Sequence, residues 1–403
     1  MKNIFDKLFL PAGSLLYALF ISIIIAIIIG GLLLVSNLYN NLEATYESTA
    51  ILQTKANNCF TELLQNVNQR NEKVNSEVNN KKWGLYNILT CEIVNYKDTI
   101  SKMALVGEQE YRYSNLALYL ADKGNALKLA GKTIIKGDIK MSDFGIKTIY
   151  INKLLFSGNY CNSCITPSQK EVPKLKEMNI LAENKSIHMN YSEIKDADIS
   201  NNSFRKPTIV VHCNVTRLTN CKLNGNFHIV SNDSISISAS CDLTDVIIKA
   251  PTVNIEDDLE GNFQIFAKKH IYVGDNVMLN YPSVLYLNSS AKGGVTIGSN
   301  VVIAGAVVVT GNNSMFDRFR YLSIDKNSTI LGQVYCKGKM QLKGKVYGSI
   351  MANTFYLETG ETSYDNTLLD VTIDNNMFPN KYAYVSFFNS DIRNEKVLIK
   401  YLQ

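Results

Sequence analysis

The sequence of 403 residues has few of the side chains, and none of the short motifs, on which common catalytic sites depend. It contains one Trp and four His, and it has no G-x-S-x-G segment, no P-loop and no H-E-x-x-H segment. Its histidines, His188, His212, His228 and His270, show no partner pattern for nucleophilic catalysis. These absences favour a protein that is not an enzyme and that uses no cofactor.

The chain also lacks a cluster of basic residues. It has 41 Lys and Arg against 36 Asp and Glu, a formal net charge of +5, and the lysines are scattered. Nucleic acid is therefore not an expected partner. With 19% charged and 46% hydrophobic residues, the composition is that of a folding chain rather than a disordered one.

The most apolar stretch is residues 15–35, LLYALFISIIIAIIIGGLLLV, which contains no charge. As a helix it would be roughly 32 Å long, enough to cross a hydrocarbon core of about 30 Å. Lys2, Asp6, Lys7 and the N-terminus precede it, and Glu43 and Glu47 are the first charged residues after it. We expect a single-pass inner membrane protein that contacts the bilayer through residues 14–36. Its N-terminus would be cytoplasmic, and the bulk of the chain periplasmic or extracellular.

A cleaved secretory signal is the alternative, although its apolar core is normally shorter, about 7–15 residues. The arrangement AG–SLLYALFISIIIAII resembles the N-terminal segment of type IV pilin-like proteins, in which a leader ending in Gly is removed. The resemblance implies cleavage between Gly13 and Ser14. Ala18 stands where most such proteins carry Glu, a departure shared with some minor pseudopilins. A plain membrane anchor is equally compatible with the segment.

The helix is predicted to continue as a polar stalk over residues 37–82, because no Gly or Pro occurs between Leu32 and Asn80. Apolar residues follow helical spacing at Phe60, Leu63, Leu64 and Val67. From Trp83 the chain becomes rich in aromatic and β-branched residues, which favours strands.

The segment ALYLADKGNALKLAGKTIIKGDI, within residues 116–140, resembles a group of uncharacterised Bacteroidetes membrane-anchored proteins in which such a strand leads to a solenoid. Over residues 205–365, short apolar strands recur about every 20 residues, such as VIIKA at 246, FQIFA at 263 and VLYLN at 284. Strands at this spacing with polar corners are typical of a β-solenoid (β-helix). The later steps G-x-V-x-x and G-S-I-x-A resemble the polymer-forming solenoid of bactofilins.

Three local patterns have competing interpretations. Ile297, Ile303 and Val309 lie six apart, as in a left-handed β-helix, or they belong to regular turns of a mixed solenoid. Cys161 and Cys164 form a C-x-x-C pair that is compatible with free thiols, a structural disulfide, or metal or redox chemistry. The acidic run Glu256, Asp257, Asp258 and Glu260 suits a solvated turn better than calcium, because it lacks the Asp-x-Asp-x-Asp-Gly order.

The predicted fold is mainly β, with a single N-terminal transmembrane helix extended into a stalk, then a β-rich domain leading into a β-solenoid. The predicted segments are a cytoplasmic leader (1–13), a transmembrane helix (14–36), a helical stalk (37–82), a β-rich domain with long loops (83–204), the β-solenoid (205–365) and a C-terminal β cap (366–403). No metal site is predicted.

We expect a non-enzymatic membrane-anchored structural protein of the envelope or cell surface, a candidate minor pilin-like or secretion-filament component. The first alternative is a membrane-tethered carbohydrate-binding or carbohydrate-active β-helix, which would need a groove lined by carboxylates and aromatics. The second is a bactofilin-like scaffold that self-associates through the strand edges at its ends.

Overall fold

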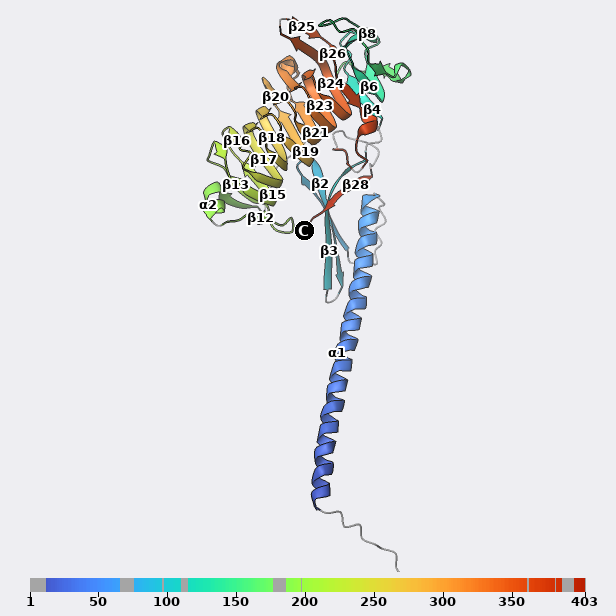
Figure 1. Ribbon diagram of the computed structural model, residues 1–403, viewed down its shortest axis with the longest axis vertical. Coiled ribbons are helices and arrows are strands. Elements are labelled where there is room, and N and C mark those ends of the chain that lie inside the picture. Colours follow the sequence, from blue (N-terminus) through green and yellow to red (C-terminus); the bar gives the residue numbers. More distant parts are fainter. Residues whose placement is uncertain are drawn as a thin grey trace, which may run out of the picture. The chain divides into compact units, whose positions relative to one another are not determined.

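The computed structural model is mainly β, with one long apolar helix near its N-terminus (Figure 1). It describes residues 12–65, 76–95, 98–109, 115–176, 186–196, 198–360, 362–380, 382–385 and 395–402. The chain divides into two compact units. The first contains most of the long helix together with Cys91–Lys102, and the second contains Val78–Thr90 and Met103–Gln403.

Helix α1 (Ala12–Leu64) is long and apolar enough to span a membrane. Its most apolar 18-residue window has a mean hydropathy of 3.1, and none of that window is buried. Ser22 Oγ donates a hydrogen bond to Leu19 O at 2.8 Å, so this hydroxyl is satisfied without water. The prediction of one N-terminal helix able to cross a bilayer is confirmed, whereas its orientation stays a prediction.

The predicted helical stalk over 37–82 is helical as far as Leu64, where the described α1 ends, and is wrong for residues 76–82, which form a strand; residues 66–75 lie outside the described residues. Residues from Ser76 onward form a strand, because Trp83 is only 2% exposed and the turn at Gly84 (φ +59°) leads directly into the next strand. The first strands are β1 (Ser76–Trp83), β2 (Tyr86–Asn95) and β3 (Asp98–Glu108).

On the helix, the residues that are buried are Leu52, Ala56 and Phe60, which lie four apart. Of the predicted stripe, Phe60 is therefore buried, and Leu63 and Leu64 are half-buried. Val67 lies outside the described residues.

The other strands, in chain order, are β4 (Leu116–Leu120), β5 (Leu127–Ala130), β6 (Ile134–Lys136), β7 (Asp138–Met141), β8 (Ile146–Thr148), β9 (Asn159–Tyr160), β10 (Ile165–Pro167), β11 (Ile187–Asn190), β12 (Asn201–Asn202), β13 (Ile209–His212), β14 (Arg217–Leu218), β15 (Lys222–Val230), β16 (Ile235–Ile237), β17 (Asp242–Ile255), β18 (Glu260–Val273), β19 (Met278–Asn288), β20 (Gly293–Ile297), β21 (Val302–Thr310), β22 (Arg320–Ile324), β23 (Thr329–Leu342), β24 (Lys345–Thr359), β25 (Thr362–Asp365), β26 (Thr367–Leu369), β27 (Thr372–Asp374) and β28 (Lys396–Tyr401). The short helices are α2 (Tyr191–Asp196), η1 (Asn162–Cys164), η2 (Ser314–Phe319) and η3 (Asn375–Met377).

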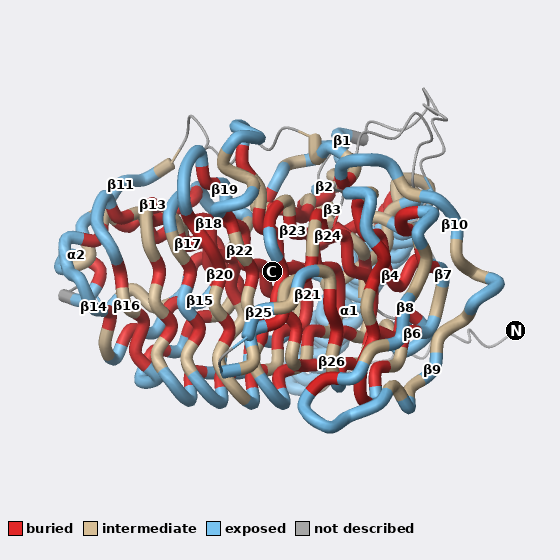
Figure 2. The backbone as a smooth tube through the Cα atoms, turned by 90° about the horizontal axis from the view of Figure 1, so that it is seen from above, coloured by how far each residue is buried: buried red, intermediate tan, exposed pale blue. Residues whose placement is uncertain are grey.

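Residues 116–167 and 187–374 form what we call the parallel stack, in which strands pair in parallel with strands of the next turn of the chain, except β25, which pairs antiparallel with β24 (Figure 1). Strand pairing aligns one column of buried aliphatic residues through the stack, namely Ile229, Ile248, Ile265, Leu285, Val307, Val334, Ile350 and Leu118. No single turn could bury these side chains alone, so stacking creates the core. Figure 2 shows buried positions running through the interior and exposed positions at the bends.

The stack does not follow chain order, which corrects two predicted boundaries. The strands of 116–167, predicted to belong to a separate β-rich domain, extend the stack beyond β24: Ile350 pairs with Leu118, and Ile373 with Ile135. The predicted cap, 366–403, is likewise divided. Its first strands, β26 and β27, lie within the stack, and β28 pairs antiparallel with β3.

Bends of the stack are built by Asn and Asp in the left-handed conformation, including Asp258, Asn276, Asn300 and Asn327 (φ 58° to 60°). Asn276 Nδ2 donates to Asp258 Oδ1 at 3.0 Å, and Asn300 Nδ2 to Asn276 Oδ1 at 3.2 Å, so successive bends are linked. The hexad interpretation is not supported, because Ile303 and Val309 lie in one strand, β21, rather than at successive corners.

Candidate functional site

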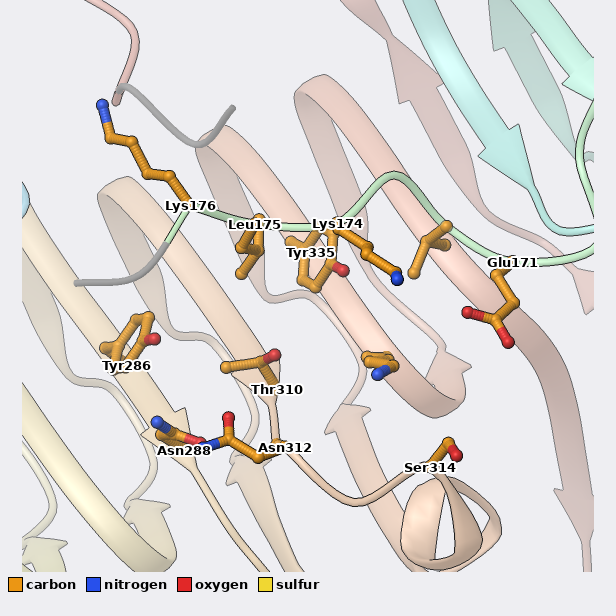
Figure 3. A pocket seen from close by; sticks show the side chains of 13 residues that line it. Glu171, Lys174, Leu175, Lys176, Tyr286, Asn288, Thr310, Asn312, Ser314 and Tyr335 are labelled. Atoms are coloured by element: carbon orange, nitrogen blue, oxygen red, sulfur yellow. The ribbon is translucent and has the colours of Figure 1, made fainter. Parts of the chain in front are cut away.

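The candidate site is a groove of about 880 Å³ on the outer face of the parallel stack (Figure 3). Strands β19, β21 and β23 form its floor, the loop from Gly311 to η2 forms one wall, and residues 168–176, here called the strap, form the other. Its lining residues are Glu171, Val172, Lys174, Leu175, Lys176, Tyr286, Asn288, Thr310, Gly311, Asn312, Ser314, Tyr335 and Lys337.

Strand alternation places the floor residues on the outer face. Leu285 and Leu287 enter the core, so Tyr286 and Asn288 point outward. Pairing then aligns an outer column of large side chains across the stack: Phe266, Tyr286, Val308, Tyr335, Met351 and Tyr119. These side chains are themselves buried in a second hydrophobic cluster, so they form the packed base of the outer face rather than exposed aromatic surface.

The strap crosses these strands and is held by hydrogen bonds to side chains of the outer face. The backbone N–H of Gln169 donates to Tyr119 Oη at 3.0 Å, and Tyr335 Oη donates to Pro173 O at 3.0 Å. Val172, which is 3% exposed, packs in the same hydrophobic cluster as both tyrosines. The strap is thus a fixed wall between Ser168 and Pro173.

A buried arginine holds the opposite wall. Arg320, 0% exposed, donates from Nε to Ser289 O at 2.9 Å and from Nη2 to Asn313 O at 2.6 Å, and its Nη1 pairs with Asp317. Gly311 lies against this guanidinium so closely that a Cβ atom there would overlap Arg320. The wall is consequently tied to β19 and β22.

Several polar side chains of the groove are available to a ligand. Within the described part of the chain, the side chains of Asn288, Thr310, Asn312 and Ser314 form no hydrogen bond. The Tyr286 hydroxyl forms none with the described residues either. Asn288 and Thr310 are direct partners on adjacent strands. Burial raises the pKa of Tyr286 to about 12, so its hydroxyl is neutral at physiological pH and can both donate and accept.

The charge of the groove is modestly positive. Figure 3 shows the side chain of Lys174 extending toward the groove and that of Lys176 extending away from it. Lys176 pairs with Glu108 at 3.8 Å, and its burial lowers its pKa. Among the described lining residues, Glu171 is the one carboxylate, against Lys174 and Lys337. Free amides and hydroxyls together with lysines suit a polar, extended, anionic ligand.

The residues singled out in the sequence lie elsewhere. Cys161 and Cys164 are joined in a disulfide at η1, with their Cα atoms 5.3 Å apart. Gly13 and Ser14 lie in the first turn of α1. The described part of the chain contains no cluster of three or more His, Cys, Asp and Glu placed to hold a metal ion.

The acidic run forms bends of the stack. Glu256 forms two hydrogen bonds with Arg217, at 2.6 and 2.7 Å. Asp257 accepts from the Asp275 amide at 2.8 Å, and Asp258 and Glu260 each accept from an Asn side chain at 3.0 Å. Each carboxylate therefore links its own segment to another turn of the stack.

Sequence reasoning missed the groove. A groove lined by carboxylates and aromatics is expected only under the alternative of a carbohydrate-binding or carbohydrate-active β-helix, and no residues are assigned to it. Tyr286 and Asn288 lie within the predicted strand VLYLN, so alternation alone would have placed them on the outer face. The strap has no such signal, because residues 168–176 read as an ordinary loop.

Comparisons with known proteins do not assign the chain to a family: no family model, curated protein or solved structure matches it.

Proposed function

We propose that this protein is a membrane-anchored, non-enzymatic envelope protein whose parallel stack is a β-solenoid and whose outer groove binds an acidic glycan. The groove is the observation on which the proposal rests. Its free amides and hydroxyls match the hydroxyl groups of sugar rings. Lys174 and Lys337 favour a sugar that carries carboxylate or sulfate groups.

We propose binding rather than cleavage because the described groove lining has fewer carboxylates than glycoside hydrolysis generally needs. Glycoside hydrolysis generally uses two carboxylates that flank the scissile bond. Glu171 is the single carboxylate among the described lining residues, and Asp317 is paired with the buried Arg320. The lining thus favours recognition of a glycan strand.

The parallel register supports the assignment as a β-solenoid, since the core column repeats with each turn of the chain. Apolar α1 supports a bilayer anchor. The charges Lys2 and Lys7 before it, and Glu43 and Glu47 after it, favour a stack outside the cytoplasm. A disulfide between Cys161 and Cys164 fits an oxidising compartment.

The test is titration calorimetry of the full-length protein in detergent with uronate-containing, sulfated and neutral oligosaccharides. We expect saturable binding of an acidic oligosaccharide, weakened at least about tenfold by Lys174→Met, because a charge-assisted hydrogen bond contributes about 1.5–3 kcal/mol. Lys326→Met is the matched control, since Lys326 is an exposed bend lysine outside the groove. Absence of saturable binding to every glycan, or equal losses in the two variants, would contradict the proposal.

A filament role is a second candidate, favoured by one observation. Helix α1 runs without interruption from the apolar segment into a polar segment, as the resemblance to type IV pilin-like proteins implies. The mass of the N-terminal peptide recovered from native membranes tests it. A terminus at Ser14 would support assembly into a pilus or secretion filament, and an intact leader would leave α1 as a permanent anchor.

End-to-end polymerisation in the manner of bactofilins is less favoured. Ile194 of α2 is 4% exposed and belongs to the core cluster, so this helix covers core surface beside β11 and β13. A capped end cannot accept another stack without displacing α2. Sedimentation of the full-length protein across a wide concentration range would detect filaments if they form.

A further inference from the structure

Two histidines from adjacent strands meet on the surface of the stack, and neither belongs to the groove lining. His188 Nδ1 lies 2.9 Å from His212 Nε2. The two rings are nearly parallel, with an interplanar angle of 18° and centroids 5.1 Å apart. His188 is exposed and His212 is half-buried, so solvent reaches the pair.

The strand register makes this meeting a property of the fold. Strands β11 and β13 pair in parallel, with His188 opposite Val210 and Asn190 opposite His212. Because Met189 and Val211 contact the core, His188 and His212 both lie on the outer face as diagonal neighbours. Their imidazoles are therefore held together by the two backbones.

The contact directs two nitrogen atoms at one point. At 2.9 Å, one of these nitrogens carries a hydrogen and the other presents its lone pair. When both histidines carry their hydrogen on the other ring nitrogen, His188 Nε2 and His212 Nδ1, two lone pairs face each other. A tetrahedral Zn²⁺ with Zn–N bonds of about 2.0–2.1 Å needs its nitrogen ligands roughly 3.3 Å apart, so the two rings must move apart and tilt until both lone pairs point at the ion.

A third side chain fixes the orientation of the first ring. Ser186 Oγ lies 3.0 Å from His188 Nε2, the ring nitrogen that faces away from His212. When His188 Nε2–H donates to Ser186 Oγ, Nδ1 is left as the lone-pair nitrogen. Metal-binding histidines are commonly oriented by such a hydrogen bond from the other ring nitrogen.

We propose that His188 and His212 form a two-imidazole site for a divalent transition metal ion of the Zn²⁺, Ni²⁺ or Cu²⁺ class, with solvent in the remaining positions. Imidazole suits these ions better than Mg²⁺ or Ca²⁺. The ion would link β11 to β13. These two strands contact α2, whose Ile194 belongs to the core cluster. This proposal is independent of the glycan groove.

Calorimetry of the full-length, EDTA-washed protein in detergent with ZnCl₂ and with NiCl₂ tests the site. We expect one saturable site per chain and a loss of affinity of at least about tenfold in His188→Asn and in His212→Asn. His270→Asn is the matched control, since the ring of His270 stacks on Tyr272 and has no second imidazole beside it. Unchanged thermal unfolding of the metal-free variants would show that they fold.

Cu²⁺ provides a second readout, the electron paramagnetic resonance spectrum, which a purely structural role of the two histidines would not change. We expect the electron paramagnetic resonance spectrum of the Cu²⁺-loaded protein to show coupling to two imidazole nitrogens, and that of either variant to show one at most. Wild-type protein without saturable binding, variants that bind like wild type, or single-nitrogen coupling in the wild type would each overturn the proposal.

Discussion

Replacing Asp317 with Ala tests the ion pair that holds one wall of the groove. Arg320 is 0% exposed, and Asp317 is its carboxylate partner. In the variant the guanidinium keeps its bonds to Ser289 O and Asn313 O but loses the compensating charge. Removing one partner of a buried pair costs about 3–5 kcal/mol, because a buried charge is left uncompensated.

Asp242→Ala is the matched control. Asp242 pairs with Lys222 at 3.4 Å, but both side chains are more than half exposed, at 63% and 69%. An exposed pair contributes about 0–1 kcal/mol. The two variants each remove one carboxylate from one ion pair, so the difference in their effects reports burial.

Urea unfolding followed by fluorescence provides the assay, because Trp83 is the only Trp and is 2% exposed. With a slope of about 3 kcal/mol per molar urea, Asp317→Ala should lower the midpoint by roughly 1 M or more. Asp242→Ala should lower it by about 0.3 M at most. Equal shifts in the two variants would refute the argument that Arg320 depends on Asp317.

Three further predictions concern the stack. Leu285→Ala should destabilise the protein by about 2–5 kcal/mol in the same assay, because Leu285 is fully buried in the core column; a loss below 1 kcal/mol would contradict that burial. Gly332→Ala should lower the free energy of unfolding more than Gly124→Ala does, because a Cβ atom at Gly332 would overlap Gly305 O of the neighbouring turn, whereas Gly124 has open space. The reverse order would count against the strand register. Burial lowers the pKa of His228 from 6.5 to about 4, so the unfolded chain binds the proton more readily. Stability from this group is present above pH 6.5 and is lost as the pH falls toward about 4, by at most about 3 kcal/mol. The loss should shrink in His228→Gln, and an unchanged pH profile in that variant would exclude His228 as its cause.

The sequence predicts strands well where apolar residues alternate. VIIKA, FQIFA and VLYLN lie within β17, β18 and β19, and they are adjacent in the stack. The position of residues 116–167 next to β24, beyond the last turns of the stack, could not be predicted, because the pairing of Ile350 with Leu118 has no local signature in the sequence. The polar composition of residues 76–82 predicts a continued helix. These residues form strand β1 instead, because burial of Trp83 outweighs that composition.

For the groove, the sequence predicts which side chains of a recognised strand face outward, but not the two walls. Alternation places Tyr286 and Asn288 on the outer face once β19 is recognised. The wall held by Arg320 depends on three partners that are separated from it in sequence by 3 to 31 residues, and no motif marks them. The strap depends on hydrogen bonds between Gln169 and Tyr119 and between Tyr335 and Pro173, which no short segment of sequence contains.

Lysine footprinting by mass spectrometry tests the central claim, glycan binding in the groove, most directly. The full-length protein in detergent is acylated at its lysines with and without a saturating acidic oligosaccharide. The account predicts that Lys174 and Lys337 are protected by the glycan, while the exposed bend lysine Lys326 reacts equally in both samples. Protection at Lys326 with none at Lys174 and Lys337 would contradict it.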